Sequence, residues 1–428
     1  MTVTIYWFRR DLRLEDNLAL SHALKSGFPV LPIFIFDDNI LDELSEDDPR
    51  ITFIYESLEK IDIKLRKYGS CIKIFKGNPL QAWKDLMDEY DIKKVYFNHD
   101  YEPYAKERDN QLTELLTAKG IESHSFKDQV IFEKNEVLKS DGKPYSIFTH
   151  YKRKWLSQFK KELVDQQEAP DLNLFFKYHI SFPSLEELHF TESAIKVRPY
   201  NLSILGNYVF GRDVPSEDST SYLGPHLRFG TISIRMVIRQ LRLKDDIFLS
   251  ELIWREFFMQ ILYHFPRVVD QNCRAKYDNI VWLNKEEEFE KWCQGKTGYP
   301  FIDAGMRQLK QTGYMHNRVR MATASFLIKH LLIDWRWGEA YFAQKLLDYE
   351  LSSNNGNWQW AAGTGCDAAP YFRVFNPITQ LLKFDKEMLY VRKWIPEIET
   401  PEYPEPIIEH AAARARALET YKTGIKLK

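Results

Sequence analysis

Indole, guanidinium and carboxamide side chains gather between residues 298 and 378. The stretch contains Trp335, Trp337, Trp358 and Trp360 together with Arg318, Arg320, Asp348, Asn354 and Asn355. A plain helical core does not need so many indoles so close to charged and amide groups. A site that stacks flat rings and transfers electrons does need them, so the stretch predicts such a site.

The spacing of the tryptophans divides them into groups. Trp358 and Trp360 are two residues apart, so on one helix they point to different sides, one toward a cofactor and the other toward a substrate pocket. Trp282 and Trp335 are isolated in the sequence, and each taken alone is more often a core residue. Trp337 is interpreted as packing.

Polar residues near position 317 interrupt an apolar helical pattern. Asn317, Arg318, Arg320 and Met321 lie there among apolar residues. Because polar groups are costly to bury without partners, the pattern has two interpretations. The residues either form solvated or salt-bridged helix edges, or they belong to a polar cluster around a ligand that includes Asp348.

The run ELIWREFF (251–258) carries a third polar pattern. Glu251, Trp254 and Arg255 stand at positions i, i+3 and i+4, so they share one helix face. An acid, an indole and a guanidinium together suit a flat heteroaromatic ligand with N–H and C=O edges. A surface ion pair beside a core tryptophan is the alternative.

Three hydroxyl residues precede a helical stretch near position 223. They are Ser219, Thr220 and Ser221. Hydroxyls and free backbone amides near a helix start can hold a phosphate, and simple N-capping is the alternative.

Length and composition define the class of protein. The chain has 428 residues, which suggests two domains, and its 44% apolar and 28% charged residues are normal for a globular protein. The formal net charge is −2, so a nucleic-acid partner would need a local basic patch. No run approaches the ~20 apolar residues of a membrane span. Cys71, Cys273, Cys293 and Cys366 are scattered without a CxxC motif, so we expect free thiols in a reducing cytoplasm.

Residues 1–125 alternate β-branched or aromatic runs with amphipathic stretches. The runs span 2–8, 30–36, 71–77, 93–99 and 121–126, and the helical patterns lie near 16–26, 51–68, 79–90 and 104–119. This rhythm predicts a doubly wound, five-stranded parallel sheet, which would bind ligands at the carboxyl ends of its strands. The glycine fingerprint GxGxxG is absent, so a dinucleotide in this domain is not supported.

The rest of the chain follows two other patterns. Residues 126–200 have no clean period and predict a connector with a few helical turns. Residues 201–428 predict an all-α domain, with helical periods at 232–243, 247–264, 286–294, 301–313, 317–333 and 338–349.

Several long motifs occur in an order and at a spacing typical of one family. They are WFRRDLRLEDNLAL (7–20), the stretch 251–257, GKTGYPFIDAGMRQL (295–309), MHNRVRM (315–321) and NNGNWQW (354–360). The chain resembles the DNA photolyase/cryptochrome family, most of all the bacterial cyclobutane pyrimidine dimer photolyases of the class I type. The resemblance covers residues 2 to about 422. It implies an N-terminal α/β antenna domain, a connector and a C-terminal helical domain that holds FAD in a U shape.

The resemblance also implies roles for individual residues. Residues expected to contact FAD are Tyr208, Thr220, Ser221, Tyr222, Leu223, Gly224, Phe248, Arg320, Asp348, Tyr349, Glu350 and Asn354. Within this set the 220s would lie at the pyrophosphate, Asp348 would pair with Arg320 beside the isoalloxazine, and Asn354 would face flavin N5. Residues expected to carry electrons to FAD are Trp358, Trp335 and Trp282, in the order proximal, middle and distal.

A second set is expected to meet damaged DNA. Residues of the pocket for the flipped dimer are Glu251, Trp254, Arg255, Asn317, Met321 and Trp360, and residues near DNA phosphates are Arg212, Arg318 and Arg373. Glu251, Asn317 and Asn354 are the expected catalytic residues. Relatives that repair (6-4) photoproducts carry two histidines four apart where this chain has Asn317 and Met321, and His316 is one place off that pattern. A cyclobutane dimer is therefore the favoured lesion.

The chain departs from the family pattern at a few positions. Tyr314 and Phe248 stand where tryptophans are usual, and both remain aromatic. Tyr104 and Ala105 replace the Asn–Glu pair of folate-binding relatives. A folate antenna is therefore in doubt, and a deazaflavin, FMN or an empty site are the alternatives.

These features predict a light-dependent repair enzyme, a carbon–carbon lyase. It would split cyclobutane pyrimidine dimers in UV-damaged DNA by electron transfer from photoexcited reduced FAD. We expect a cytoplasmic monomer. The alternatives are a cryptochrome-type blue-light photoreceptor without repair activity, a plain FAD-binding electron-transfer protein and a (6-4) photolyase. Asn354 favours repair, because plant cryptochromes carry an aspartate at this position.

Overall fold

The structure, a computed structural model, describes residues 1–242 and 245–426, and the chain forms two compact units. Unit 1 comprises Met1–Glu136, Leu156–Pro199 and Leu223–Leu243, and unit 2 comprises Val137–Trp155, Tyr200–Tyr222 and Lys244–Lys428. Each unit is made of separate segments of the chain, whereas the sequence predicted the continuous domains 1–125, 126–200 and 201–428. Those domain boundaries remain a prediction. In the part of the chain that the structure describes, no helix has the length and apolarity needed to cross a membrane.

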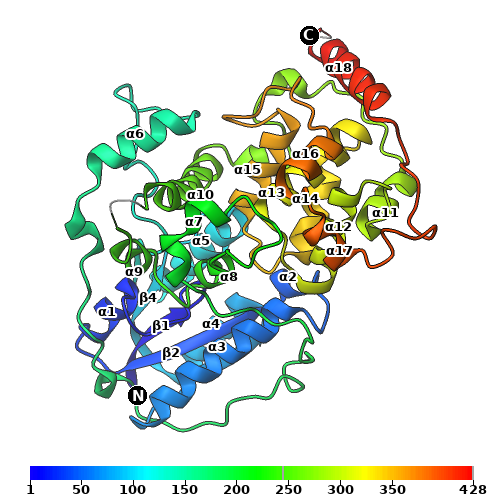
Figure 1. The fold of residues 1–428 in the computed structure, drawn as a ribbon. Helices are drawn as coiled ribbons and strands as arrows, with labels where there is room; N and C mark the ends of the chain where they lie inside the picture. The colour runs from blue at the N-terminus through cyan, green and yellow to red at the C-terminus, as the bar shows by residue number, and fades with distance from the viewer. Residues whose placement is uncertain (243–244, 427–428) are drawn as a thin grey trace. The chain divides into compact units, whose positions relative to one another are not determined.

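Unit 1 is built on a five-stranded parallel sheet (Figure 1). Its strands are β1 (Thr2–Phe8), β2 (Val30–Asp37), β3 (Lys73–Gly77), β4 (Asp91–Asn98) and β5 (Glu122–Phe126). They follow the order β3-β2-β1-β4-β5, so the direction of winding reverses between β1 and β4. The predicted doubly wound parallel fold is confirmed.

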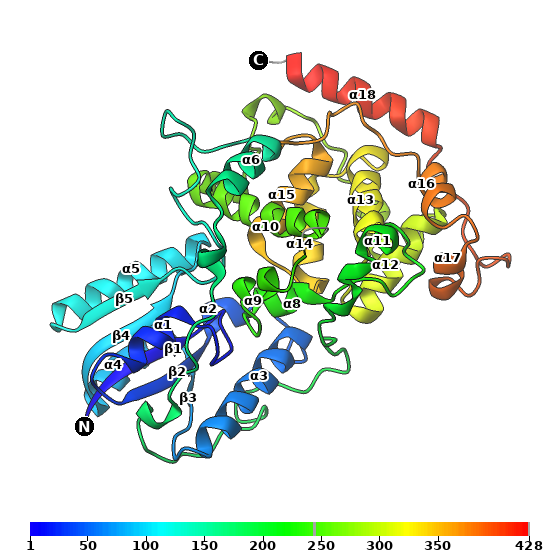
Figure 2. The same ribbon diagram turned by 60° about the vertical axis from the view of Figure 1, so that its left-hand side comes forward.

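Alternate side chains of the strands enter two separate cores. Tyr6 and Phe8 pack on one face with α1 (Leu18–Leu24) and α3 (Pro49–Arg66). Ile5 and Trp7 pack on the other face with α4 (Pro79–Glu89) and α5 (Pro103–Ala118), and Figure 2 shows these helices around the sheet. The period-2 alternation of the strands therefore produces a sheet covered on both faces. The short α2 (Asp38–Leu41) directly follows β2.

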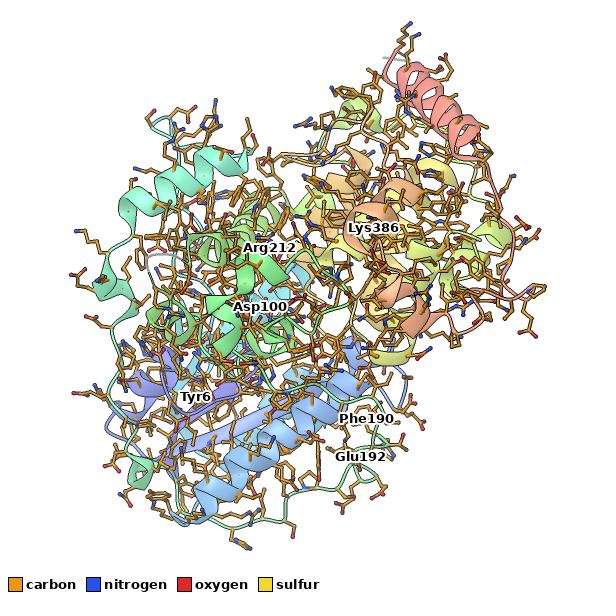
Figure 3. All side chains as sticks on the ribbon, in the orientation of Figure 1. Tyr6, Asp100, Phe190, Glu192, Arg212 and Lys386 are labelled. Carbon is orange, nitrogen blue, oxygen red and sulfur yellow. A yellow bond between two sulfur atoms is a disulfide. The ribbon has the colours of Figure 1, made fainter. Side chains whose placement is uncertain are left out.

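The crevice at the reversal point of the sheet is filled with charged side chains. Arg10 follows β1 and pairs with Asp100 and Glu102, each at 3.1 Å, beyond the end of β4 (Figure 3 labels Asp100). Tyr104 lies on α5 and donates its hydroxyl to Asp37 at 2.7 Å. These contacts occupy the carboxyl ends of the strands, where open α/β sheets bind ligands.

Unit 2 is helical. Its helices are α7 (Tyr208–Gly211), α10 (Asp246–His264), α11 (Glu286–Gln294), α12 (Pro300–Thr312), α13 (Asn317–Ser325), α14 (Trp335–Lys345), α15 (Leu351–Ala362), α16 (Pro377–Phe384), α17 (Leu389–Trp394) and α18 (His410–Lys426). Helix α6 (Phe148–Gln158) runs across the boundary at residue 155. Helices α8 (Leu223–Arg228) and α9 (Ile234–Arg239) belong to unit 1. Residue 243, the predicted end of the α9 pattern, lies outside the described residues.

Two predicted helices differ from the observed ones. The period 317–333 is not one α-helix, because α13 ends at Ser325 and a π-helical turn, Phe326–His330, follows it. The period 338–349 is shifted, because Asp334 accepts a hydrogen bond from the backbone of Arg336 and starts α14 at Trp335. That helix ends at Lys345, so Asp348 lies in a loop before α15. The aspartate was an N-cap signal that periodicity alone does not detect.

Two of the four predicted free thiols are in fact bonded. Cys273 and Cys366 form a disulfide, with their Cα atoms 5.9 Å apart and their positions 93 apart in sequence. The backbone N–H of Cys273 donates to the side chain of Gln359 in α15 (2.9 Å), and that of Arg274 donates to the carbonyl of Thr364 just after this helix (3.0 Å). This long-range pairing brings the two cysteines together. Cys71 and Cys293 are free, as expected.

Candidate functional site

A cavity of about 340 Å³ opens in unit 2 and is lined by residues of several helices. Its lining residues are Arg212, Glu251, Trp254, Arg255, Phe258, Asn317, Arg318, Met321, Ser353, Asn357 and Trp360. Volumes of about 300–1,000 Å³ are typical of small-molecule sites. The cavity is therefore large enough for a bound group.

Three helix faces supply this lining. Helix α15 packs against both α10 and α13. Each helix turns residues three or four apart toward the cavity, such as Glu251 and Trp254 on α10 and Asn317 and Met321 on α13. Helix α13 begins where His316 accepts a hydrogen bond from the backbone of Arg318, at 3.2 Å.

The cavity unites most of the residues predicted to meet DNA or substrate. Arg212, Glu251, Trp254, Arg255, Asn317, Arg318, Met321 and Trp360 all line it, and Arg373 does not. The Arg373 guanidinium instead lies 5.8 Å from the centre of the Trp360 ring. The sequence analysis expected these residues to lie together. Their individual roles remain predictions.

Aromatic rings form the apolar part of the lining. Trp254 stacks on Phe148 of α6, with ring centres 3.7 Å apart and planes 10° from parallel. The same indole lies 5.4 Å from Phe258. Phe148 is held in turn by a hydrogen bond from its backbone to Asp367, at 3.0 Å. The stack fixes the plane of Trp254, so one indole face is available as a flat platform.

The charged part of the lining is already paired. Arg212, labelled in Figure 3, contacts Glu251 at 2.8 Å, and Arg318 contacts Asp213 at 2.7 Å. The Arg212 guanidinium lies 5.3 Å from the centre of the Tyr208 ring. Burial, with a smaller contribution from Glu251, raises the pKa of Tyr208 to about 12. The tyrosine is therefore a neutral hydrogen-bonding group at physiological pH.

The residues predicted to contact FAD are distributed over several elements. Arg320 forms a two-point ion pair with Asp348, at 3.2 and 2.9 Å. Tyr208 packs edge-on against Phe248 at 4.9 Å, and Tyr222 does the same against Tyr314 at 5.2 Å.

The remaining residues predicted to contact FAD fall in two short segments, 220–224 and 349–350. Thr220 and Ser221 lie in the loop after α7, and the Ser221 carbonyl accepts a hydrogen bond from the backbone of Asn201 at 2.8 Å. Leu223 and Gly224 are the first two residues of α8, which belongs to unit 1. Glu350 is buried and lies 3.4 Å from Arg255, whereas Tyr349 packs against the main core of unit 2.

Asn354 is held by a carboxyl group that the sequence analysis missed. Its amide donates to the backbone carbonyl of Glu339 at 3.0 Å and to the side chain of Glu339 at 2.9 Å. Burial raises the pKa of Glu339 to about 7, although the bond from Asn354 lowers it. Glu339 therefore titrates close to neutral pH beside Asn354.

Glu339→Gln should remove a pH dependence of stability. The folded protein keeps the Glu339 proton up to about pH 7, whereas an unfolded glutamate loses it near 4.5, so stability falls as pH rises through this window. The variant cannot ionise and its side-chain oxygen still accepts from Asn354, so relative to the wild type it should gain about 3 kcal/mol of stability between pH 4.5 and 8. Urea unfolding at both pH values measures this. Parallel pH curves for the two proteins would contradict the assignment.

The tryptophans predicted to carry electrons pack against one core. Trp335 and Trp358 are buried within it, and Trp282 packs against its edge. The Trp335 indole donates to Asn272 at 3.0 Å, and the Trp282 ring lies 6.0 Å from Tyr421. Trp360, two residues after Trp358, packs against the edge of the same core and also lines the cavity, which Trp358 does not. The two-residue spacing thus separates the indoles as predicted. Trp337 packs on Phe289 at 5.2 Å.

Gly338→Ala should destabilise this core. A β-carbon at position 338 would lie 2.1 Å from the Trp358 ring and 2.5 Å from Leu327, so the helices must move apart. Overpacking of this kind costs about 1–3 kcal/mol, measurable by urea unfolding. Adding Trp358→Phe removes the atoms that collide, so the double variant should lose less than the sum of the single losses. Strict additivity would argue against the predicted collision.

Three lining residues escaped the sequence analysis. Ser353 and Asn357 precede Trp360 by seven and three positions on α15, and Phe258 lies one turn after Trp254 on α10. Extending the helical period from Trp360 and Trp254 would have found all three. Asp213 and Glu339 gave no such signal, because Arg318 and Asn354, which they contact, lie on other elements.

Comparison with known proteins agrees with this fold. The family model "FAD binding domain of DNA photolyase" matches residues 248–402, and the model "DNA photolyase" matches residues 4–171. The deoxyribodipyrimidine photo-lyase of Halobacterium salinarum is 35% identical, with 98% of each chain covered. That of Escherichia coli is 34% identical, with 100% of each chain covered.

Solved structures give the same result. The archaeal photolyase from Sulfolobus tokodaii, solved with two FAD molecules, is 36% identical with a TM-score of 0.87, covering 99% of this chain and 100% of the other. The class III photolyase from Agrobacterium tumefaciens is 34% identical with the same TM-score, covering 100% and 98%. A cryptochrome from Synechocystis, at 24% identity and a TM-score of 0.85 over 98% and 99%, shares the fold.

These matches define the class of protein as an FAD-binding flavoprotein with an α/β unit and a helical unit. The chain belongs to the DNA photolyase family.

Proposed function

We propose that this protein is a light-dependent DNA repair enzyme that splits cyclobutane pyrimidine dimers, a deoxyribodipyrimidine photo-lyase. One observation carries the proposal: a single cavity collects the acid, the two indoles and the amide that such a lesion would need. Relatives about a third identical over their full length bear this enzyme name. A plain electron-transfer protein would not need this cavity.

The cavity chemistry suits a flipped-out lesion. A dimer inside a duplex cannot reach a buried group, and a lesion that already stacks badly costs less to flip. Trp254 and Trp360 offer aromatic faces to the two bases. Glu251 and Asn317 can hydrogen-bond the pyrimidine edges, and Glu251 would stabilise charge as it develops on the dimer. The absence of a histidine pair at Asn317 and Met321 favours this lesion over a (6-4) product.

The residues present fit FAD. The Arg320–Asp348 pair offers fixed polar groups for a ring edge, and the Asn354 amide is held in place by Glu339. Tyr208, Phe248 and the segment 220–224 would hold the rest of the cofactor. When bound, FAD supplies the light-driven electron donation. Trp358, Trp335 and Trp282 would form the route by which this chain reduces it.

Basic residues at and beside the cavity would hold the DNA backbone. Arg212 and Arg318 line the cavity, and Arg373 lies over Trp360. Phosphate contacts of this kind fix register without reading sequence. The protein is expected to act as a cytoplasmic monomer. The second chromophore stays open between a deazaflavin, FMN, folate and none.

One experiment separates repair from signalling. The reduced, FAD-loaded protein is illuminated with blue light in the presence of a UV-damaged thymine oligonucleotide, and absorbance at the thymine band is followed. Recovery of thymine absorbance that needs both light and protein is the expected result. Lack of recovery with intact flavin would overturn the repair function in favour of the photoreceptor alternative.

A further inference from the structure

A chain of alternating charges stands at the rim of the cavity. Glu251 contacts Arg212 at 2.8 Å, Arg212 contacts Asp213 at 3.8 Å, and Asp213 contacts Arg318 at 2.7 Å. We name these residues the rim chain. Its two arginines line the cavity and are 19% and 25% exposed, whereas Asp213 is 44% exposed and lies outside the lining. Glu251 is 40% exposed, so the two carboxylates are about equally open to solvent, and Asp213 is the member of the rim chain with no predicted role.

One carboxylate oxygen of Asp213 lies close to both arginines. The same Oδ1 atom lies 2.7 Å from Nε of Arg318 and 3.8 Å from Nε of Arg212. The positive charge of Arg318, followed by that of Arg212, lowers the pKa of Asp213 against the effect of burial. The group is therefore a carboxylate at neutral pH. An anionic oxygen between two guanidinium groups is also the arrangement in which arginines bind phosphate.

The rest of the rim chain limits how the arginines can respond. Arg212 keeps Glu251 as a second partner and stacks on Tyr208, and Arg318 lies 5.3 Å from the Phe384 ring. Both guanidinium groups would thus stay near their positions if the Asp213 carboxylate moved away. Because the Asp213 side chain is 44% exposed, it can turn into solvent at low cost.

We propose that Asp213 is an intramolecular competitor of DNA phosphate. It occupies the anion position between Arg212 and Arg318 in the free protein, and a backbone phosphate displaces it on binding. The carboxylate thereby weakens contact with any DNA strand and limits non-specific binding, while lesion recognition depends on the cavity. The inference rests on the proposed function, since it requires that DNA binds at this cavity.

Asp213→Asn tests the competition. DNA affinity is measured by fluorescence anisotropy between 50 and 200 mM salt, on one duplex with a thymine dimer and on the same duplex undamaged. The variant should bind both about threefold to tenfold more tightly, because a phosphate no longer competes with a carboxylate. In the wild type, the displaced carboxylate would take up a cation from solution and so reduce the net number of ions released. The variant has no such carboxylate, so its plot of log affinity against log salt concentration should be steeper by up to about one ion. The ratio between the two duplexes should not change.

Two controls separate this effect from a general change of charge. Glu217→Gln removes an exposed carboxylate of the same loop that is not part of the rim chain, and should change affinity less than about twofold. In an Arg318→Gln background, Asp213→Asn should give a smaller gain, because one of its two partners is missing.

A loss of DNA affinity in Asp213→Asn would overturn the inference. If Asp213 instead positions the arginines for DNA, Asp213→Asn will bind more weakly and with a shallower salt dependence. An unchanged affinity would refute the competition as well. Failure of the wild type to bind or repair damaged DNA would instead be a failure of the proposed function.

Discussion

Glu251→Ala should lower the quantum yield of dimer splitting by roughly tenfold or more while FAD stays bound. Glu251 lines the cavity beside Trp254, and in the proposed function its carboxylate would accept hydrogen bonds from a pyrimidine edge. Its loss removes a fixed polar group where charge would develop. The measurement is thymine recovery per absorbed photon, with flavin content read from the visible spectrum.

A conservative variant and a measurement of lesion affinity separate an effect on catalysis from effects on binding and folding. Glu251→Gln keeps a hydrogen-bonding side chain without the charge, so its yield should lie between those of the wild type and the alanine variant. Measuring lesion affinity for each protein shows how much of the loss is binding, since removal of Glu251 also frees Arg212 from its 2.8 Å partner. A yield equal to that of the wild type in Glu251→Ala would refute the role of this residue.

Cys366→Ser should lower the free energy of unfolding by about 4 kcal/mol. The disulfide to Cys273 closes a loop of 93 residues, and a cross-link of that span strongly restricts the unfolded chain. The bond also ties together the segments that hold Asn272, the partner of Trp335, and the loop that leads to Arg373. Urea unfolding under non-reducing conditions measures the loss.

Thiol counting supplies the decisive control. Denatured wild-type protein should show two reactive thiols before reduction and four after it, because Cys71 and Cys293 are free. Cys293→Ser, a change at the half-buried free cysteine, should cost much less than Cys366→Ser. Four reactive thiols without reduction, together with unchanged stability in Cys366→Ser, would restore the original expectation of free cysteines.

The sequence predicted best where structure depends on neighbours in the chain. Strand β1 and helix α11 have the predicted bounds, because alternation over residues 2–8 and a glycine at position 295 are local signals. The face shared by Glu251, Trp254 and Arg255 was equally local, and it lines the cavity. The split of residues 317–333 into an α-helix and a π-helical turn was not predicted, since the apolar residues Phe326, Leu327 and Ile328 continue the helical pattern into a turn too short to change it visibly.

The sequence by itself determined the fold class, the family and the candidate lining of the cavity, because motifs and periodicity are properties of short segments. Only the tertiary structure decided which distant groups meet. It paired Cys273 with Cys366, placed Glu339 beside Asn354, and set Asp213 between two arginines. The Cys273–Cys366, Glu339–Asn354 and Asp213–Arg318 contacts join residues that are not neighbours in the chain, and sequence spacing does not encode such distances. The charge state of Glu339 likewise follows from burial, which only packing creates.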